Sequence, residues 1–174
     1  MISKTAMLSL VKELRWKEVR DGLTENPDLI GVRDKRGRTW LHLACGVDIT
    51  KRQAEAVRDS IKLAEILLAQ NGADIDPEAE GATPLLSAVQ WSRFKAAEEL
   101  LKRGADPNYQ DSKGMTALHC MLKKSVEKKY VSMFLEYEAK TDIKNKAGLT
   151  AAAIMVRKRD PDFRRMLQLD DPKK

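Results

Sequence analysis

The side chains best suited to catalysis or metal binding in this sequence are its two histidines and two cysteines. His42 and His119 each lie three residues after a threonine, and Cys45 and Cys120 follow them within three residues. An imidazole can serve as an acid, a base or a metal ligand, and a thiolate can serve as a nucleophile. Because the two T-x-x-H segments are distant copies of one pattern, we expect them in separate structural repeats. The two histidines are therefore not expected to share a metal ion.

No short motif of a known catalytic class surrounds these residues. The sequence lacks C-x-x-C, H-E-x-x-H and G-x-S-x-G segments, and it lacks the glycine-rich loops that bind phosphate. Two cysteines are too few for a disulfide framework, and each is expected to be a small buried apolar residue in a reducing compartment. We therefore predict a protein that is not an enzyme and that binds no metal or cofactor.

The composition is typical of a single globular domain. Of the 174 residues, 43% are hydrophobic and 33% are charged, which is too apolar for a disordered chain and too charged for a membrane protein. Lys and Arg number 32 against 26 Asp and Glu, and the net charge of +6 favours acidic partners. The sequence contains no apolar run of about 18 residues and no signal-peptide pattern. A cytoplasmic location is expected, and removal of an export signal is left open.

Four glycines recur in matching contexts and divide the chain into repeats. They are separated by 44, 33 and 34 residues, and a threonine follows each of them two positions later. A glycine tolerates the positive φ of a tight turn, and a threonine hydroxyl can cap the first turn of a helix. Each segment therefore predicts a turn followed by a helix. The structural repeat residues are Gly37, Thr39, His42, Gly81, Thr83, Gly114, Thr116, His119, Gly148 and Thr150.

With these segments and a period near 33 residues, the chain resembles the ankyrin-repeat family. The resemblance implies an all-α repeat solenoid in which hairpin-like loops join helix-turn-helix units. It also implies that His42 and His119 brace neighbouring hairpins through hydrogen bonds. We expect one domain over 1–174. Its predicted parts are a degenerate helical cap over 1–32, repeats over 33–76, 77–109 and 110–143, and a capping repeat over 144–174.

The first repeat departs from the others in length. Gly37 and Gly72 are 35 residues apart, whereas Gly81 and Gly104 are 23 apart. The additional residues keep apolar spacings of three and four, which predicts a longer outer helix after an enlarged loop over 46–52.

The ends of the helices also follow from local residue types. Gly72 and Gly104 are expected to end outer helices as left-handed caps, and Glu138 occupies the third such position, where we expect a strained or rebuilt turn. Asp160 and Pro161 predict the start of a short last helix over 162–169. Helices over 5–15 and 17–25 are expected to cap the other end.

Partners of the family dock on hairpin tips and on the exposed side of the inner helices, and the resemblance implies the same here. Trp91 lies where the repeat exposes a variable polar residue, and a partly exposed tryptophan among charges is typical of a binding hot spot. The alternative is that Trp91 packs against the enlarged loop. Trp16 and Trp40 are interpreted as packing residues. The predicted partner-binding residues are Lys35, Arg36, Arg38, Gln90, Trp91, Lys113, Met115, Lys123, Lys124, Lys146, Leu149, Arg157 and Lys158.

Most of these residues are cationic, whereas acidic residues such as Glu55, Glu65, Glu98 and Glu99 fall on the predicted outer helices. We therefore expect a basic row that faces an acidic protein surface, with a merely solvated face as the alternative. Met115 and Leu149 would add apolar contacts at the tips. The predicted function is a monomeric, non-catalytic protein-protein interaction module that acts as an inhibitor, immunity or adaptor protein. The alternative, binding of nucleic acid or another polyanion, is disfavoured by an aromatic content of 5%.

Overall fold

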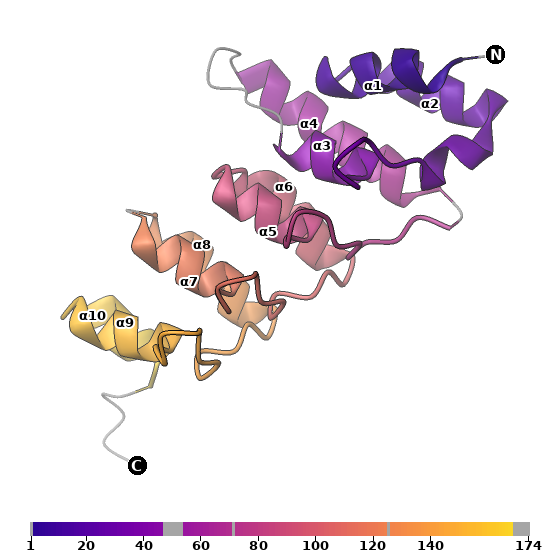
Figure 1. Cartoon of the computed structure of the whole chain (residues 1–174). Helices are drawn as coiled ribbons and strands as arrows, with labels where there is room; N and C mark the ends of the chain where they lie inside the picture. The colour runs from indigo at the N-terminus through magenta and orange to yellow at the C-terminus, as the bar shows by residue number, and fades with distance from the viewer. Residues whose placement is uncertain (1, 47–53, 71, 125, 169–174) are drawn as a thin grey trace. The chain divides into compact units, whose positions relative to one another are not determined.

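The computed structural model describes residues 2–46, 54–70, 72–124 and 126–168, and its regular elements are helices (Figure 1). The chain forms two compact units, unit 1 over Met1–Asp106 and unit 2 over Pro107–Lys174. In each unit, short inner helices alternate along the chain with outer helices, and hairpins precede the inner helices. This element order confirms the predicted all-α repeat class.

Unit 1 contains a pair of cap helices and two further helix pairs. The inner helices α3 and α5 pack on each other, as do the outer helices α4 and α6. The cap continues both layers, because α1 packs on α3 and α2 packs on α4. The elements of unit 1 are α1 (Lys4–Lys12), α2 (Trp16–Glu25), the 3-10 helix η1 (Pro27–Gly31), α3 (Trp40–Gly46), α4 (Ala54–Leu68), α5 (Pro84–Gln90) and α6 (Phe94–Lys102).

The helix ends of unit 1 follow from the residues that occupy them. The Thr83 hydroxyl oxygen accepts a hydrogen bond from the Leu86 N–H at 3.3 Å, and Pro84 fills the first helical position, where no N–H is needed. α4 has 15 residues against nine in α6, which confirms that the additional residues of the first repeat lengthen its outer helix. Of the enlarged loop predicted over 46–52, residues 47–52 lie outside the described residues.

The core of unit 1 lies between its two helical layers. Trp40, Leu85 and Leu100 are buried there, and the Trp40 indole N–H donates to the Leu29 carbonyl at 2.6 Å. The Trp16 indole N–H donates to the Asp59 carboxylate at 3.2 Å. Both tryptophans are thus packing residues, as predicted, with their single polar atom paired.

Unit 2 contains two helix pairs. α7 packs on α8 and on α9, and α9 packs on α10. The last helix begins as predicted, because the Asp160 side chain caps it by accepting from the Asp162 N–H at 2.9 Å. The Lys128 ammonium joins α8 to this helix through ion pairs to Asp160 at 2.7 Å and to Asp162 at 2.6 Å. The helices of unit 2 are α7 (Ala117–Lys123), α8 (Lys128–Glu136), α9 (Ala151–Arg157) and α10 (Pro161–Met166).

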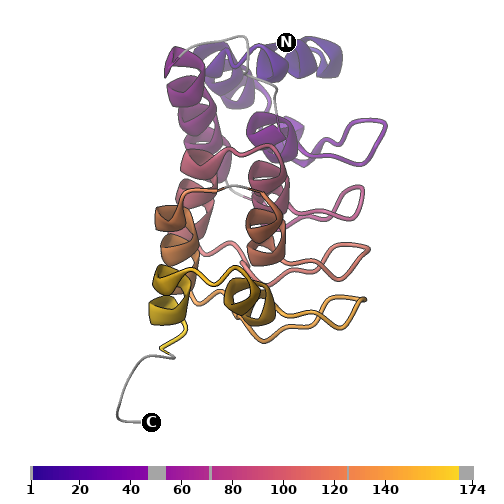
Figure 2. The ribbon, with the colours of Figure 1, turned by 90° about the vertical axis from the view of Figure 1, so that its left-hand side faces the viewer.

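Four hairpins precede the inner helices, and in each unit they project from the helical layers (Figure 2). We number them first (33–39), second (78–83), third (110–116) and fourth (144–150). In the first, the Asp34 carboxylate accepts the backbone N–H groups of Arg36 and Arg38, each at 2.9 Å. Asp111 and Asn145 do the same in the third and fourth. A short acceptor side chain at this position therefore shapes three of the turns.

The second hairpin is tighter than the other three. Ala79 and Ala82 exchange both backbone hydrogen bonds at 3.0 Å, and only Glu80 and Gly81 lie between them. Both of these residues have positive φ, 53° for Glu80 and 73° for Gly81. This is the geometry of a two-residue hairpin loop.

The turns after the outer helices share one geometry. Gly104, with φ of 87°, follows α6, and the Ala105 N–H donates to the Leu100 carbonyl at 3.1 Å. Glu138 has φ of 60°, and the Ala139 N–H donates to the Phe134 carbonyl at 3.0 Å. The turn at Glu138 is therefore strained rather than rebuilt, because a side chain occupies the left-handed region.

Candidate protein-binding surface

Each histidine joins two successive hairpins within its unit. His42 Nδ1 accepts the Thr39 backbone N–H at 3.3 Å, which leaves the proton on Nε2 to donate to the Ala82 carbonyl of the second hairpin at 3.1 Å. In unit 2, His119 Nδ1 accepts the Thr116 N–H at 3.2 Å, and Nε2 donates to the Leu149 carbonyl at 3.0 Å. Both ring nitrogens are occupied in each case, so neither imidazole is available as a ligand or base in this conformation.

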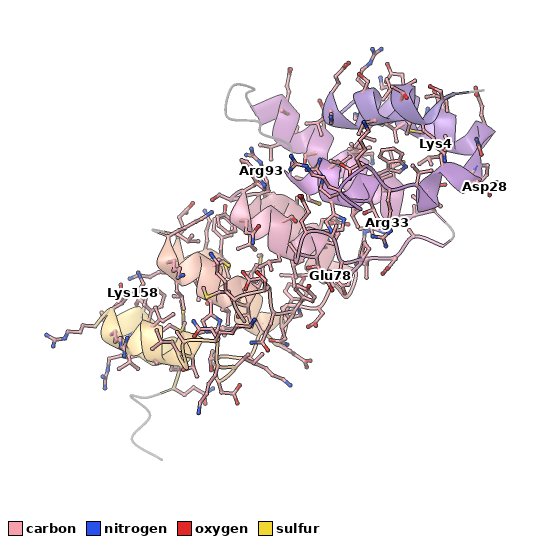
Figure 3. All side chains as sticks on the ribbon, viewed as in Figure 1. Lys4, Asp28, Arg33, Glu78, Arg93 and Lys158 are labelled. Atoms are coloured by element: carbon pink, nitrogen blue, oxygen red, sulfur yellow. The ribbon has the colours of Figure 1, made fainter. Side chains whose placement is uncertain are left out.

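Beside each histidine, a second side chain also joins the two hairpins by hydrogen bonds, and it was not predicted from the sequence. Arg33 donates to the Gly37 carbonyl at 2.9 Å and to the Glu78 carbonyl of the next hairpin at 3.2 Å (Figure 3). Gln110 donates to the Gly114 carbonyl at 2.8 Å and to the Lys144 carbonyl at 3.0 Å. The feature of the sequence that could have indicated these contacts is a long side chain with N–H donors directly before Asp34 and Asp111.

The two thiols are held in their neutral form. Burial raises the pKa of the Cys45 thiol to about 12. Burial also raises the pKa of the Cys120 thiol, and the Asp111 carboxylate acts in the same direction. A nucleophilic cysteine needs the opposite shift, toward thiolate at neutral pH.

The cations of the first hairpin are not segregated from acidic groups, and this part of the charge prediction is wrong. Arg38 forms a two-point ion pair with Asp34, with Nη2 at 2.7 Å from Oδ2. Glu80, on the tip of the second hairpin, lies 3.5 Å from the Arg36 guanidinium and 4.0 Å from that of Arg38. The tight second turn causes this pairing, because it aims Glu80 at the neighbouring tip. Lys35 is exposed and has no ion-pair partner among the described residues.

Three of the predicted binding residues of unit 1 line one hollow of about 320 Å³. Trp91, at the end of α5, is 53% exposed and forms one wall. Its ring lies across Gly46, since a Cβ on that glycine would be 3.6 Å from Trp91 Cδ1. Trp91 thus packs against Gly46, the first residue of the predicted enlarged loop, and is still more than half exposed, while its role in partner binding stays a prediction. The lining residues used below are Lys12, Arg38, Leu43, Glu80, Gln90 and Trp91.

Unit 2 carries a separate set of cations. Lys113 and Lys146 lie on adjoining tips, where the Lys146 N–H donates to the Lys113 carbonyl at 3.0 Å. Lys124 and Lys158 line a second hollow, of about 280 Å³, at the ends of α7 and α9. Among the predicted binding residues of this unit, the exposed cations with no ion-pair partner in the described part of the chain are Lys113, Lys123, Lys146, Arg157 and Lys158. How these residues relate to the cations of unit 1 stays a prediction.

The expectation that Met115 adds an apolar contact to the surface is wrong. Its side chain is only 4% exposed, because the Asn145 amide of the fourth hairpin covers it with Nδ2 at 3.3 Å from Sδ. Leu149 is half-buried in the fourth hairpin. When one hairpin tip stacks on the next, the residue after its glycine becomes buried. The position of that residue in the repeat does not by itself predict this burial.

Neither unit holds a recognisable metal site within the described residues, since no three His, Cys, Asp or Glu side chains converge there. In the same part of the chain, no helix combines the length and apolar character needed to cross a membrane.

Comparison with known proteins agrees with the repeat geometry. A family model of three ankyrin repeats matches residues 3–111, which is more than half of the chain. The chain belongs to the ankyrin-repeat family. Members of this family are in general non-catalytic modules that mediate protein-protein interaction.

Individual relatives are large proteins of which the chain resembles one part. It is 36% identical over 89 residues, 51% of this chain, to Neurogenic locus notch homolog protein 1 of Danio rerio. It is 30% identical over 118 residues, 68% of this chain, to Ankyrin repeat and MYND domain-containing protein 1 of Mus musculus, and 26% identical over 162 residues, 86% of this chain, to Rabankyrin-5 of Homo sapiens. The matches span 3%, 11% and 13% of those relatives' lengths.

Proposed function

We propose that this protein is a non-catalytic interaction module that binds one protein partner through its hairpin tips and the exposed ends of its inner helices. The observation that carries the proposal is Trp91, a large aromatic side chain left 53% exposed in a hollow on a family scaffold built for binding. Partly exposed tryptophans among charges dominate many protein interfaces.

The partner we propose carries an acidic surface. Five of the predicted binding residues of unit 2 are exposed cations with no ion-pair partner among the described residues, so a partner's carboxylates would not have to displace internal ones. Such a charge arrangement speeds association and makes it sensitive to salt. Binding of this kind suits an inhibitor, immunity or adaptor role. A monomer in a reducing, cytoplasmic compartment fits the proposal, because the two thiols are unpaired and the Cys45 thiol is fully buried.

Affinity capture with matched variants tests the proposal. The chain is immobilised as wild type, as Trp91→Ala and as Lys123→Glu, and partners are captured from its native lysate and identified by mass spectrometry. Val57→Ala is the control for loss of an exposed apolar side chain, since Val57 is 36% exposed on α4. Lys140→Glu is the control for the charge reversal, since Lys140 is exposed beyond α8.

The expected result is one dominant protein that the wild type and both controls retain and that at least one test variant loses. Retention of mainly nucleic acid, with a steep dependence on salt, would replace the proposal by polyanion binding. Retention of no specific protein at low salt would contradict it outright.

A further inference from the structure

We propose that the hollow beside Trp91 accepts an extended peptide segment, with one apolar side chain against the Trp91 ring and a neighbouring carboxylate between Lys12 and Arg38. The inference rests on the proposed binding function and names the chemistry of one partner segment. It also assigns to Glu80 the role of an internal competitor for that carboxylate.

The walls of the hollow fit one apolar side chain. Trp91 forms one side, Leu43 of α3 lies beside it, and Ala79 and Ala82 of the second hairpin complete the apolar lining. A volume of about 320 Å³ is at the lower end of the range for ligand pockets, roughly 300–1,000 Å³. Such a space suits a single large side chain of a peptide better than a folded element.

The rim of the hollow supplies the charge. Lys12, in the last turn of α1, lines the hollow and has no ion-pair partner among the described residues. Arg38 is held in place by Asp34, with the Nη2 atom at 2.7 Å from the carboxylate, so its position does not depend on a ligand. Two cations at the edge of a hollow that has both apolar and polar walls favour a carboxylate next to the inserted side chain.

Glu80 is the one acidic residue that lines the same hollow among the described residues. Its contacts to Arg36 and Arg38, at 3.5 and 4.0 Å, are long and exposed, and such pairs contribute little. A partner carboxylate can therefore take its place at Arg38. Glu80 also disfavours a phosphate backbone at this site, because it places a negative charge on the rim, and a lone tryptophan offers no stacking platform for successive bases.

Selection from a random peptide library on the immobilised full chain tests this proposal. The expected consensus is one aromatic or aliphatic residue with Asp or Glu within two positions. A synthetic consensus peptide is then titrated against variants by fluorescence anisotropy. Trp91→Ala is expected to weaken binding more than about tenfold, as for an interface hot spot. Lys12→Glu is expected to weaken it about threefold or more, and Glu80→Gln to tighten it about threefold.

Lys4→Glu is the matched control, because Lys4 is an exposed lysine at the far end of the same helix, α1 (Figure 3). It should leave the affinity unchanged, and thermal unfolding of each variant verifies that it is folded. A selection with no apolar–acidic consensus overturns the proposal, as does a consensus peptide that is indifferent to Trp91→Ala and Lys12→Glu. Trp91-dependent binding of a single-stranded oligonucleotide in place of peptides overturns it too.

The capture experiment and the peptide titration together distinguish the assignment of this hollow from the broader proposal of a protein-binding function. If a partner protein is captured and its binding is insensitive to Trp91→Ala, the interaction function stands and the assignment of this hollow is wrong. If no protein partner exists, both fail together.

Discussion

In unit 1, His42 and Arg33 join the first hairpin to the second, and in unit 2, His119 and Gln110 join the third hairpin to the fourth. The carbonyls that accept these bonds lie at corresponding places in the next hairpin. Arginine is charged and glutamine is neutral, but each has a side-chain N–H group that donates to a carbonyl of its own hairpin and to a carbonyl of the next one. The repeat therefore selects a donor at this position rather than a residue type.

The two units also differ at one position where a side chain in unit 1 forms fewer hydrogen bonds than its counterpart in unit 2. In unit 2, Asn108 accepts the Lys140 N–H at 2.7 Å with Oδ1 and donates to the Glu138 carbonyl at 3.2 Å with Nδ2. Asp76 is the counterpart in unit 1, and its Oδ2 accepts the Asp106 N–H at 2.9 Å. Within the described part of the chain, its Oδ1 is buried without a hydrogen-bond partner, because a carboxylate has no proton to donate.

A third difference concerns how closely the tips stack. In unit 2, Gly114 lies against the fourth hairpin, and a Cβ on it would be 2.9 Å from the Lys146 backbone nitrogen. In unit 1, a Cβ on Gly37 would meet nothing within 4 Å. Four predictions test differences between corresponding positions of the two units.

The largest effect is expected at Gly114. Gly114→Ala adds a backbone clash to the cost of a positive φ of 71°, so the free energy of unfolding should fall by more than about 2 kcal/mol. Gly37→Ala, with φ of 77° and open space, should lose only about 1 kcal/mol. Urea unfolding followed by circular dichroism measures both. Equal losses would show that the contact between the third and fourth hairpins imposes no constraint.

The next effect is a gain in stability at Asp76. Asp76→Asn restores the donor that Asn108 has and should raise the free energy of unfolding by about 1 kcal/mol at neutral pH. Burial raises the pKa of Asp76 above its ordinary value of 3.8, and the nearby Asp106 and Asp74 carboxylates act in the same direction. The wild type thus recovers stability as the pH falls through the raised pKa of Asp76 toward 3.8, so the gain should shrink over that range. The matched change Asn108→Asp should destabilise unit 2, and a loss of stability in Asp76→Asn would contradict the assignment.

A smaller gain is expected at Glu138, the non-glycine member of the left-handed turns. Glu138→Gly removes the strain of a side chain at φ of 60° and should stabilise the protein by about 0.5 kcal/mol. Gly104→Ala, the reverse change in unit 1, should destabilise it by about 1 kcal/mol. Thermal unfolding of both variants gives the comparison, and a Glu138→Gly protein that melts earlier would show that the Glu138 side chain has a stabilising role.

The smallest effect is the pH dependence that His42 gives to unit 1. Burial lowers the pKa of His42 below its ordinary value of 6.5, and the Arg33 and Arg38 charges act in the same direction. The unfolded chain therefore binds this proton more tightly than the folded one. The stabilisation is complete above pH 6.5 and is lost as the pH falls from there through the lowered pKa. An NMR titration, assigned with His42→Gln, should give a midpoint below 6.5, and a midpoint above that value would refute the brace as described.

Local residue types were sufficient to predict the repeat class and several helix starts, whereas the cap helix predicted over 5–15 ends already at Lys12. Glycine at positive φ, proline at a first helical position and Asp160 as a cap each act over one turn of chain, so their effect does not depend on distant residues. The longer outer helix followed from its apolar spacing alone. For the same reason the short last helix was placed correctly at its start, Pro161.

The surface chemistry was decided by contacts between repeats. Met115 was expected at the surface and is covered by Asn145, and the cations of the first hairpin were expected to be apart from acidic residues but lie beside Glu80. Both outcomes depend on which turn the next hairpin adopts and how closely it stacks. Tertiary packing sets the distances between residues about 30 to 45 positions apart, as at Met115–Asn145 and Arg36–Glu80. A sequence pattern that spans one turn or one helix cannot predict such distances, because it contains only one of the two residues.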